Sequence, residues 1–136
     1  MPNAGRTRRP LTSADPVESA IASAISRVLS MDSKQVAGEL NRLVGLKLTA
    51  AIGGVTETRR ASKWAKGSLP RRLEALKAAL RATYAITARY DEAAARSWFT
   101  STNQGLGLRS PLAVLRAAEN LEDYDVVVSR AVRDAT

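Results

Sequence analysis

Apolar residues recur at helical spacing along most of the chain, which predicts helices rather than strands. The first such stripe lies between Pro16 and Leu29, and Asp15, Pro16 and Glu18 together are typical of a helix start. The second begins at Asp32 or Ser33 and ends at Gly45. The inward positions of these two helices are predicted to be Val17, Ile21, Ala24, Ile25, Val28 and Leu29, then Val36, Leu40, Leu43 and Val44. No segment keeps the alternation of a half-buried strand, so we expect an all-α protein with seven or eight helices.

The segment from residue 46 to residue 67 indicates two short helices joined by a turn at Gly53-Gly54. Glycine suits such a turn because it adopts positive φ without steric cost. The second helix is capped by Thr56, or by Glu57 or Thr58. Ala61 and Trp64 are three residues apart and predict its buried side. The pattern is that of a helix-turn-helix, whose second helix lies in the DNA major groove, although the interval from the turn to Trp64 is one residue longer than is common.

Positive charge is concentrated in and just after this second helix. The chain has a net charge of +8, and residues 53–81 hold eight Lys or Arg but two Glu. Arg and Lys are the side chains that bind guanine edges and phosphates. The candidate DNA-binding residues are Thr58, Arg59, Arg60, Ser62, Lys63 and Lys66 on the helix, with Arg71 and Arg72 beyond it as phosphate contacts. The alternative is an ordinary charged face that keeps the protein in solution.

The rest of the chain is predicted to be helical with one long loop. A long helix opens at Pro70 and reaches about Tyr90. The residues along its buried side are predicted to be Leu69, Leu73, Leu76, Leu80, Tyr84 and Ile86 or Thr87. Shorter helices follow over about 91–99, 112–120 and 124–133, separated by the turn-rich loop 100–110 and the acidic link 119–125. We divide the chain into a disordered basic arm at 1–13, a helix-turn-helix DNA-binding domain at 14–90 and a C-terminal helical partner-binding region at 91–136.

The composition argues against catalysis. The chain contains neither Cys nor His, which removes disulfides, Cys/His metal sites and the commonest nucleophile–base pairs. Gly105 and Gly107 follow no strand and precede no Gly-Lys-Ser/Thr, so they do not form a phosphate loop. We therefore expect no enzyme activity, no catalytic residue, no cofactor and no metal. No apolar run approaches the roughly 18 residues of a membrane span, and a cytoplasmic protein is expected.

One C-terminal pattern resembles a known family. Trp98-Phe99-x-x-x-Asn103-x-x-Leu106-x-x-Arg109-Ser110-Pro111-x-x-x-Leu115-Arg116 is similar to the toxin-binding region of the Xre/MbcA/ParS antitoxin family, in which it follows a helix-turn-helix. The resemblance covers about residues 46–120. It implies an antitoxin that pairs with a RES-domain toxin and represses its own operon. Toxins of this type attack NAD. The residues that it implies for the toxin-binding region, some as scaffold, are Trp98, Phe99, Asn103, Leu106, Arg109, Pro111 and Leu115.

The sequence therefore leaves three hypotheses. The first is a DNA-binding repressor that is the antitoxin of a type II toxin–antitoxin pair, a homodimer because operators are symmetric. The second is a stand-alone helix-turn-helix repressor of a phage or mobile element without a toxin. The third is a protein-interaction module that does not bind DNA specifically. Salt separates the DNA-binding hypotheses from the third, because binding through phosphates weakens steeply with salt and apolar pairing does not. A neighbouring open reading frame for a RES-type toxin would separate the first hypothesis from the second.

Overall fold

The computed structural model of the protein describes residues 16–136, and these residues are all-helical, as the sequence predicts. Residues 1–15, which include the predicted arm 1–13 and the predicted capping residue Asp15, lie outside the described part. The eight α-helices are α2 (Pro16–Leu29), α3 (Ser33–Val44), α4 (Leu46–Ile52), α5 (Thr58–Ala65), α6 (Leu73–Thr87), α7 (Glu92–Thr100), α8 (Pro111–Ala117) and α9 (Leu121–Ala135). A single 3₁₀ turn, η1 (Gln104–Leu106), lies in the loop between α7 and α8.

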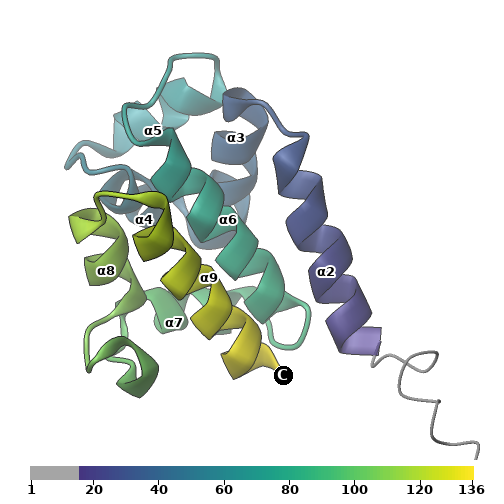
Figure 1. Ribbon diagram of the computed structural model, residues 1–136. Helices are drawn as coiled ribbons and strands as arrows, with labels where there is room; N and C mark the ends of the chain where they lie inside the picture. The colour runs from purple at the N-terminus through teal and green to yellow at the C-terminus, as the bar shows by residue number, and fades with distance from the viewer. Residues whose placement is uncertain (1–15) are drawn as a thin grey trace, which may run out of the picture.

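Helix α6 forms the centre of the molecule. Figure 1 shows it between α2 and α9, and it packs most extensively against α9. Its inward positions alternate large residues with alanines that are fully buried, among them Ala75, Ala79 and Ala82. Small side chains at these positions let neighbouring helices approach closely. One hydrophobic cluster runs from Ile21 to Ala135, so residues on both sides of position 90 share a core.

Capping side chains fix where several helices begin. The Gln35 backbone N donates to Asp32 Oδ1 at 2.8 Å, and the Gln35 side chain accepts from the Asp32 backbone, which completes a capping box. Ser110 caps α8 in front of Pro111, which occupies the first position of the helix. Asn120 caps α9, so this helix begins at Leu121, three residues before the predicted start. The predicted acidic link is therefore largely the first turn of α9, where acidic side chains favour the helix dipole.

Two predicted core positions are wrong. Leu29 is 78% exposed, because it ends α2 and the neighbouring Val28 fills the inward position. Leu69 is 77% exposed. It precedes α6, which begins at Leu73 and not at Pro70, so it cannot share the stripe of that helix. The four predicted inward residues of α3 are all buried.

A polar cluster joins α2, α3 and α6. The Tyr84 hydroxyl donates to Glu39 Oε1 at 2.8 Å, and Arg42 pairs with the same carboxylate at 3.0 Å. The Arg27 guanidinium lies 5.0 Å from the centre of the Tyr84 ring. Burial and the hydrogen bond to Glu39 raise the pKa of Tyr84 to about 12. The neutral hydroxyl thus connects α6 to α3 at a half-buried site.

Candidate nucleic-acid interface

Helices α4 and α5 are joined by a turn of five residues, 53–57. The turn is closed by hydrogen bonds from Gly54 N to Ala51 O and from Val55 N to Ala50 O, each 3.0 Å. Positive φ is required only at Gly54, where φ is +83°. Gly53 has a helical φ of −74°, so backbone conformation does not explain why glycine occupies this position. A Cβ there would meet Trp64 Cζ3 at 2.7 Å, and the missing side chain lets the indole pack on the turn.

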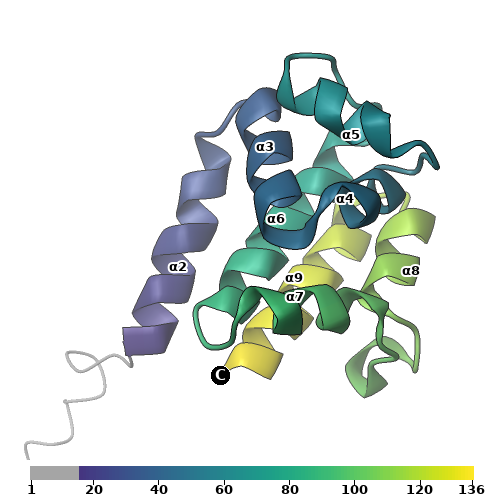
Figure 2. The ribbon, with the colours of Figure 1, turned by 180° about the vertical axis from the view of Figure 1, so that it is seen from behind.

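The buried side of α5 is the predicted one. Ala61 is fully buried and Trp64 is 1% exposed, which confirms the predicted phase of this helix. Asn41 on α3 donates from Nδ2 to the Ala61 carbonyl at 2.9 Å, a contact that holds α5 against α3. Sequence reasoning missed Asn41, because its partner is 20 residues away in the chain. Figure 2 shows α5 at one end of the molecule, beside α3 and α4.

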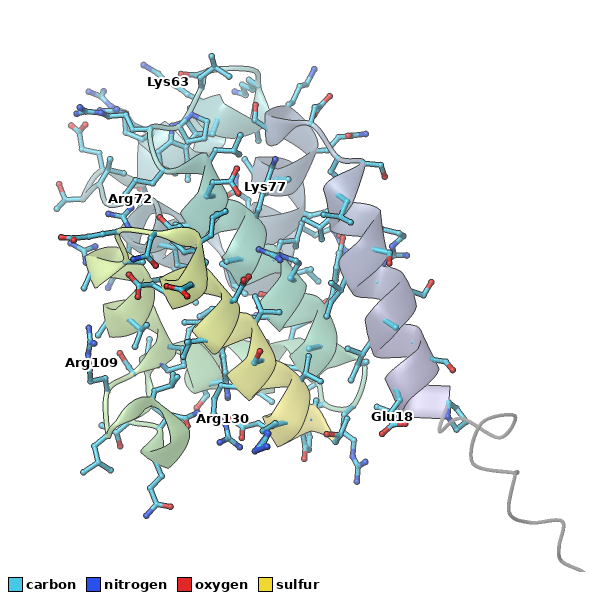
Figure 3. The ribbon with its side chains drawn as sticks, in the orientation of Figure 1. Glu18, Lys63, Arg72, Lys77, Arg109 and Arg130 are labelled. Carbon is cyan, nitrogen blue, oxygen red and sulfur yellow. The ribbon has the colours of Figure 1, made fainter. Side chains whose placement is uncertain are left out.

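The opposite side of α5 is exposed and basic. Thr58, Arg59, Arg60, Lys63 and Lys66 are all exposed, and Ser62 is half-buried. Figure 3 shows Lys63 at the outer edge of the molecule. Arg59 forms an ion pair with Glu57 at 3.6 Å, but both side chains are largely exposed, so the pair is weak. Most of the predicted DNA-binding residues are therefore gathered on one surface, which we call the basic face (Thr58, Arg59, Arg60, Lys63, Lys66).

The start of α5 decides between the predicted capping residues. The helix begins at Thr58, so the N-cap position belongs to Glu57 rather than to Thr56 or Thr58. The Glu57 side chain makes no capping hydrogen bond. A helix start that lacks a side-chain cap retains backbone N–H groups that suit an anion.

Arg71 and Arg72 have different environments. Arg71 is exposed. Arg72 is half-buried, and its Nη2 donates to the carbonyls of Leu115 at 2.6 Å and Ala118 at 3.2 Å at the end of α8. A Cβ at Gly54 would lie 3.1 Å from Arg72 Cδ, so this side chain also covers the turn. Arg72, labelled in Figure 3, thus ties α6 to α8 and to the turn, and it is not free for the predicted phosphate contact.

Most of the residues implied by the family resemblance build the interior. Phe99, Leu106, Pro111 and Leu115 are buried, so no partner reaches them in this structure. Trp98 is half-buried and meets Phe99 edge to face, with 5.1 Å between ring centroids. Of the seven, only Arg109 is exposed; its Nη2 lies 3.4 Å from the Ala113 carbonyl.

Asp134 of α9 organises the loop that follows α7. Its Oδ2 accepts from Trp98 Nε1 at 2.8 Å and from Asn103 Nδ2 at 2.9 Å, and Arg130 pairs with Oδ1 at 2.7 Å. Burial raises the pKa of Asp134, but these hydrogen bonds outweigh it and hold the pKa below its ordinary value. Asn103 also accepts from Gly105 N at 2.9 Å, so its side chain holds the backbone of the following turn. Asp134 was not predicted as a partner of Trp98, because 36 residues separate them.

The described residues define an all-helical protein with one basic, exposed helix at an end of the molecule. No protein-family model, no curated protein and no solved structure matches the chain. No helix among residues 16–136 has the length and apolar character needed to cross a membrane.

Proposed function

We propose that the protein binds double-stranded DNA through the basic face of α5 and regulates transcription. The observation that carries this proposal is the division of α5 into two sides. Ala61 and Trp64 fix one side in the core, and the basic face on the other side projects from an end of the molecule. A short helix held in this way after a turn matches the recognition helix of a helix-turn-helix.

The charges of the basic face support the same proposal. Four of its five residues are Arg or Lys. Arg can bind guanine through two hydrogen bonds, and Lys and Thr can contact bases or phosphates. The helix start without a side-chain cap adds backbone donors suited to a phosphate oxygen. Glu57 is the carboxylate paired within this region, and its partner Arg59 remains 74% exposed.

A mobility-shift titration of the purified protein tests the proposal. The probe is the duplex upstream of its own coding region, with a scrambled duplex as competitor, at two salt concentrations. We expect selective binding whose affinity falls steeply with salt, because phosphate contacts release counterions. Arg59→Ala and Lys63→Ala should each weaken binding by about 1–3 kcal/mol if the side chain contacts a base, or lower the salt slope by about one if it contacts a phosphate.

Arg89→Ala provides the matched control. Arg89 is an exposed arginine just after the C-terminal end of α6, and Figure 1 shows that α6 ends away from α5. Its removal should leave DNA affinity unchanged, whereas a general loss of net charge would affect all three variants alike. Equal DNA affinity in the wild type and both α5 variants would contradict the proposal and leave α5 as scaffold.

Pairing with a RES-domain toxin, which the resemblance implies, stays a proposal for the C-terminal region. It is supported by Leu108, which is 66% exposed and adopts a φ of +67° beside the exposed Arg109. A leucine in the left-handed region costs roughly 1–2 kcal/mol, and such strain with an exposed side chain on a loop surface suits a contact residue. Co-purification with a RES-domain protein encoded beside this chain tests the pairing. Leu108→Glu should disrupt the complex and Leu69→Glu, on another exposed leucine, should not; an unaffected complex would contradict this contact.

A further inference from the structure

A continuous stripe of side chains runs along the exposed side of α9. Its members follow the helical spacing i, i+3, i+4, i+7, i+8, i+11, and they are Glu122, Asp125, Val126, Ser129, Arg130 and Arg133. Together with Gly105 they line a hollow of about 450 Å³. The other side of α9, with Val127 and Ala131, is fully buried and packs on α6. We call the exposed stripe the α9 face; in Figure 1 it belongs to the helix at the front of the molecule.

The α9 face carries opposite charges in its two halves. Glu122 and Asp125 lie in the N-terminal half, and Arg130 and Arg133 lie in the C-terminal half. None of the ion pairs formed within residues 16–136 uses Glu122, Asp125 or Arg133. Between the two halves, Val126 is 50% exposed. The face therefore offers two separated charges of each sign around a small apolar centre.

Arg130 is held in place on this face. It pairs with Asp134, and it lies over Gly105, where a Cβ would meet the guanidinium carbon at 2.8 Å. The absence of a side chain at position 105 therefore allows the guanidinium to lie across the loop next to α9. A fixed guanidinium loses little freedom when a second carboxylate approaches it.

We propose that the α9 face binds the α9 face of a second copy in antiparallel orientation. The register that sets Val126 opposite Ser129 also sets Asp125 opposite Arg130 and Glu122 opposite Arg133. A two-fold axis repeats each pair, so the same six positions supply both sides of the contact. The arrangement of charge along α9 is thus complementary to itself only when the partner helix runs in the opposite direction.

The contact should be weak, because one helix pair is smaller than a standard stable interface and its ion pairs are exposed. We expect a dissociation constant on the order of 100 μM. The start of α9 lies near the start of α6, where Arg71 and Leu121 line one hollow, and α5 is at the same end (Figure 1). Antiparallel pairing therefore places the two α5 helices at opposite ends of the dimer. The dimer would then bridge two duplex segments rather than occupy adjacent half-sites. This consequence, unlike the pairing itself, rests on the proposed DNA binding.

Sedimentation velocity of the full chain without DNA tests the pairing, over about 10–500 μM, a range that brackets the expected dissociation constant. Glu122→Lys sets two like positive charges against each other at both symmetric positions, and Arg133→Glu does the same with negative charges. We expect each variant to weaken dimerisation about tenfold. In an equimolar mixture of the two variants, each replaced side chain faces an opposite charge, so the heterodimer should recover the wild-type association.

Glu18→Lys is the matched control, because Glu18 and Glu122 both lie in the first turn of a helix and Glu18 is on α2. It should dimerise like the wild type, and circular dichroism should show all variants folded. A wild type that stays monomeric to the highest concentration, or a Glu122→Lys variant that dimerises like Glu18→Lys, would overturn the proposal. A mixture of the two variants that stays monomeric would overturn the antiparallel register. Since no DNA is present, failure of the proposed DNA binding would not affect any of these results.

Discussion

Replacing Gly53 by alanine should destabilise the protein, although the backbone there suits alanine. Gly53 has φ −74° and ψ 0°, and alanine is favoured over glycine in helical backbone by about 1 kcal/mol. The new Cβ, however, would meet Trp64 Cζ3 at 2.7 Å, well inside the roughly 3.5–4.0 Å of ordinary carbon contacts. Trp64 is 1% exposed, so its ring can move only by displacing other core residues.

The size of the effect follows from these two opposing contributions. Overpacking a well-filled site costs about 1–3 kcal/mol, and the gain in backbone propensity offsets up to about 1 kcal/mol of it. We expect a net loss of about 1–2 kcal/mol in the free energy of unfolding, or roughly 3–8 °C in Tm for a domain of this size. Urea denaturation followed by far-ultraviolet circular dichroism measures it without relying on the fluorescence of Trp64.

Two further variants isolate the cause. Gly38 lies inside α3, and a Cβ there meets nothing within 4 Å, so Gly38→Ala should stabilise by about 0.5–1 kcal/mol. Trp64→Phe removes the outer indole ring, so in that background Gly53→Ala should cost much less, with a coupling free energy of about 1 kcal/mol. If Gly53→Ala stabilised the protein as Gly38→Ala does, or cost the same with phenylalanine at position 64, the close approach would not explain this glycine.

Three more expectations follow from half-buried polar contacts. The lowered pKa of Asp134 means that its charged form stabilises the fold at pH 7, and that this stability is lost as the pH falls through the folded-state pKa. Asp134→Asn should therefore cost about 1–2 kcal/mol at pH 7 and less as the pH falls below the ordinary Asp value of about 3.9, as followed by urea denaturation over a series of pH values. Tyr84, with its pKa raised to about 12, stabilises the fold fully below about pH 10 and loses this contribution as the pH rises from 10 to 12. An alkaline absorbance titration should show a late tyrosine ionisation near pH 12, and Tyr84→Phe should remove it; a titration without this late step would contradict the hydrogen bond to Glu39. Arg72→Ala should cost about 1–3 kcal/mol, because it leaves the Leu115 and Ala118 carbonyls without this donor, and an unchanged thermal transition would show that water replaces it.

Local interactions were enough for much of the fold. The Asp32–Gln35 capping box and Ser110–Pro111 set helix starts through contacts within three residues, which a sequence displays directly. The phase of α5 also followed from sequence, because Ala61 and Trp64 are the apolar pair at helical spacing among basic neighbours. Helical class, the buried side of α3 and the concentration of positive charge near α5 were predictable for the same reason.

The tertiary structure decided what depends on residues far apart in the chain. Arg72 looked like a phosphate contact until the end of α8, 43 residues later, supplied carbonyl acceptors for it. Gly53 looked like a positive-φ residue, but glycine is needed at this position because a Cβ would collide with the ring of Trp64. The α9 face could be separated from the buried side of α9 only once α6 was in place against Val127. Capping and helical periodicity depend on residues a few positions apart, so they can be predicted from the sequence. The partner that a side chain binds depends on which distant atoms the fold brings next to it.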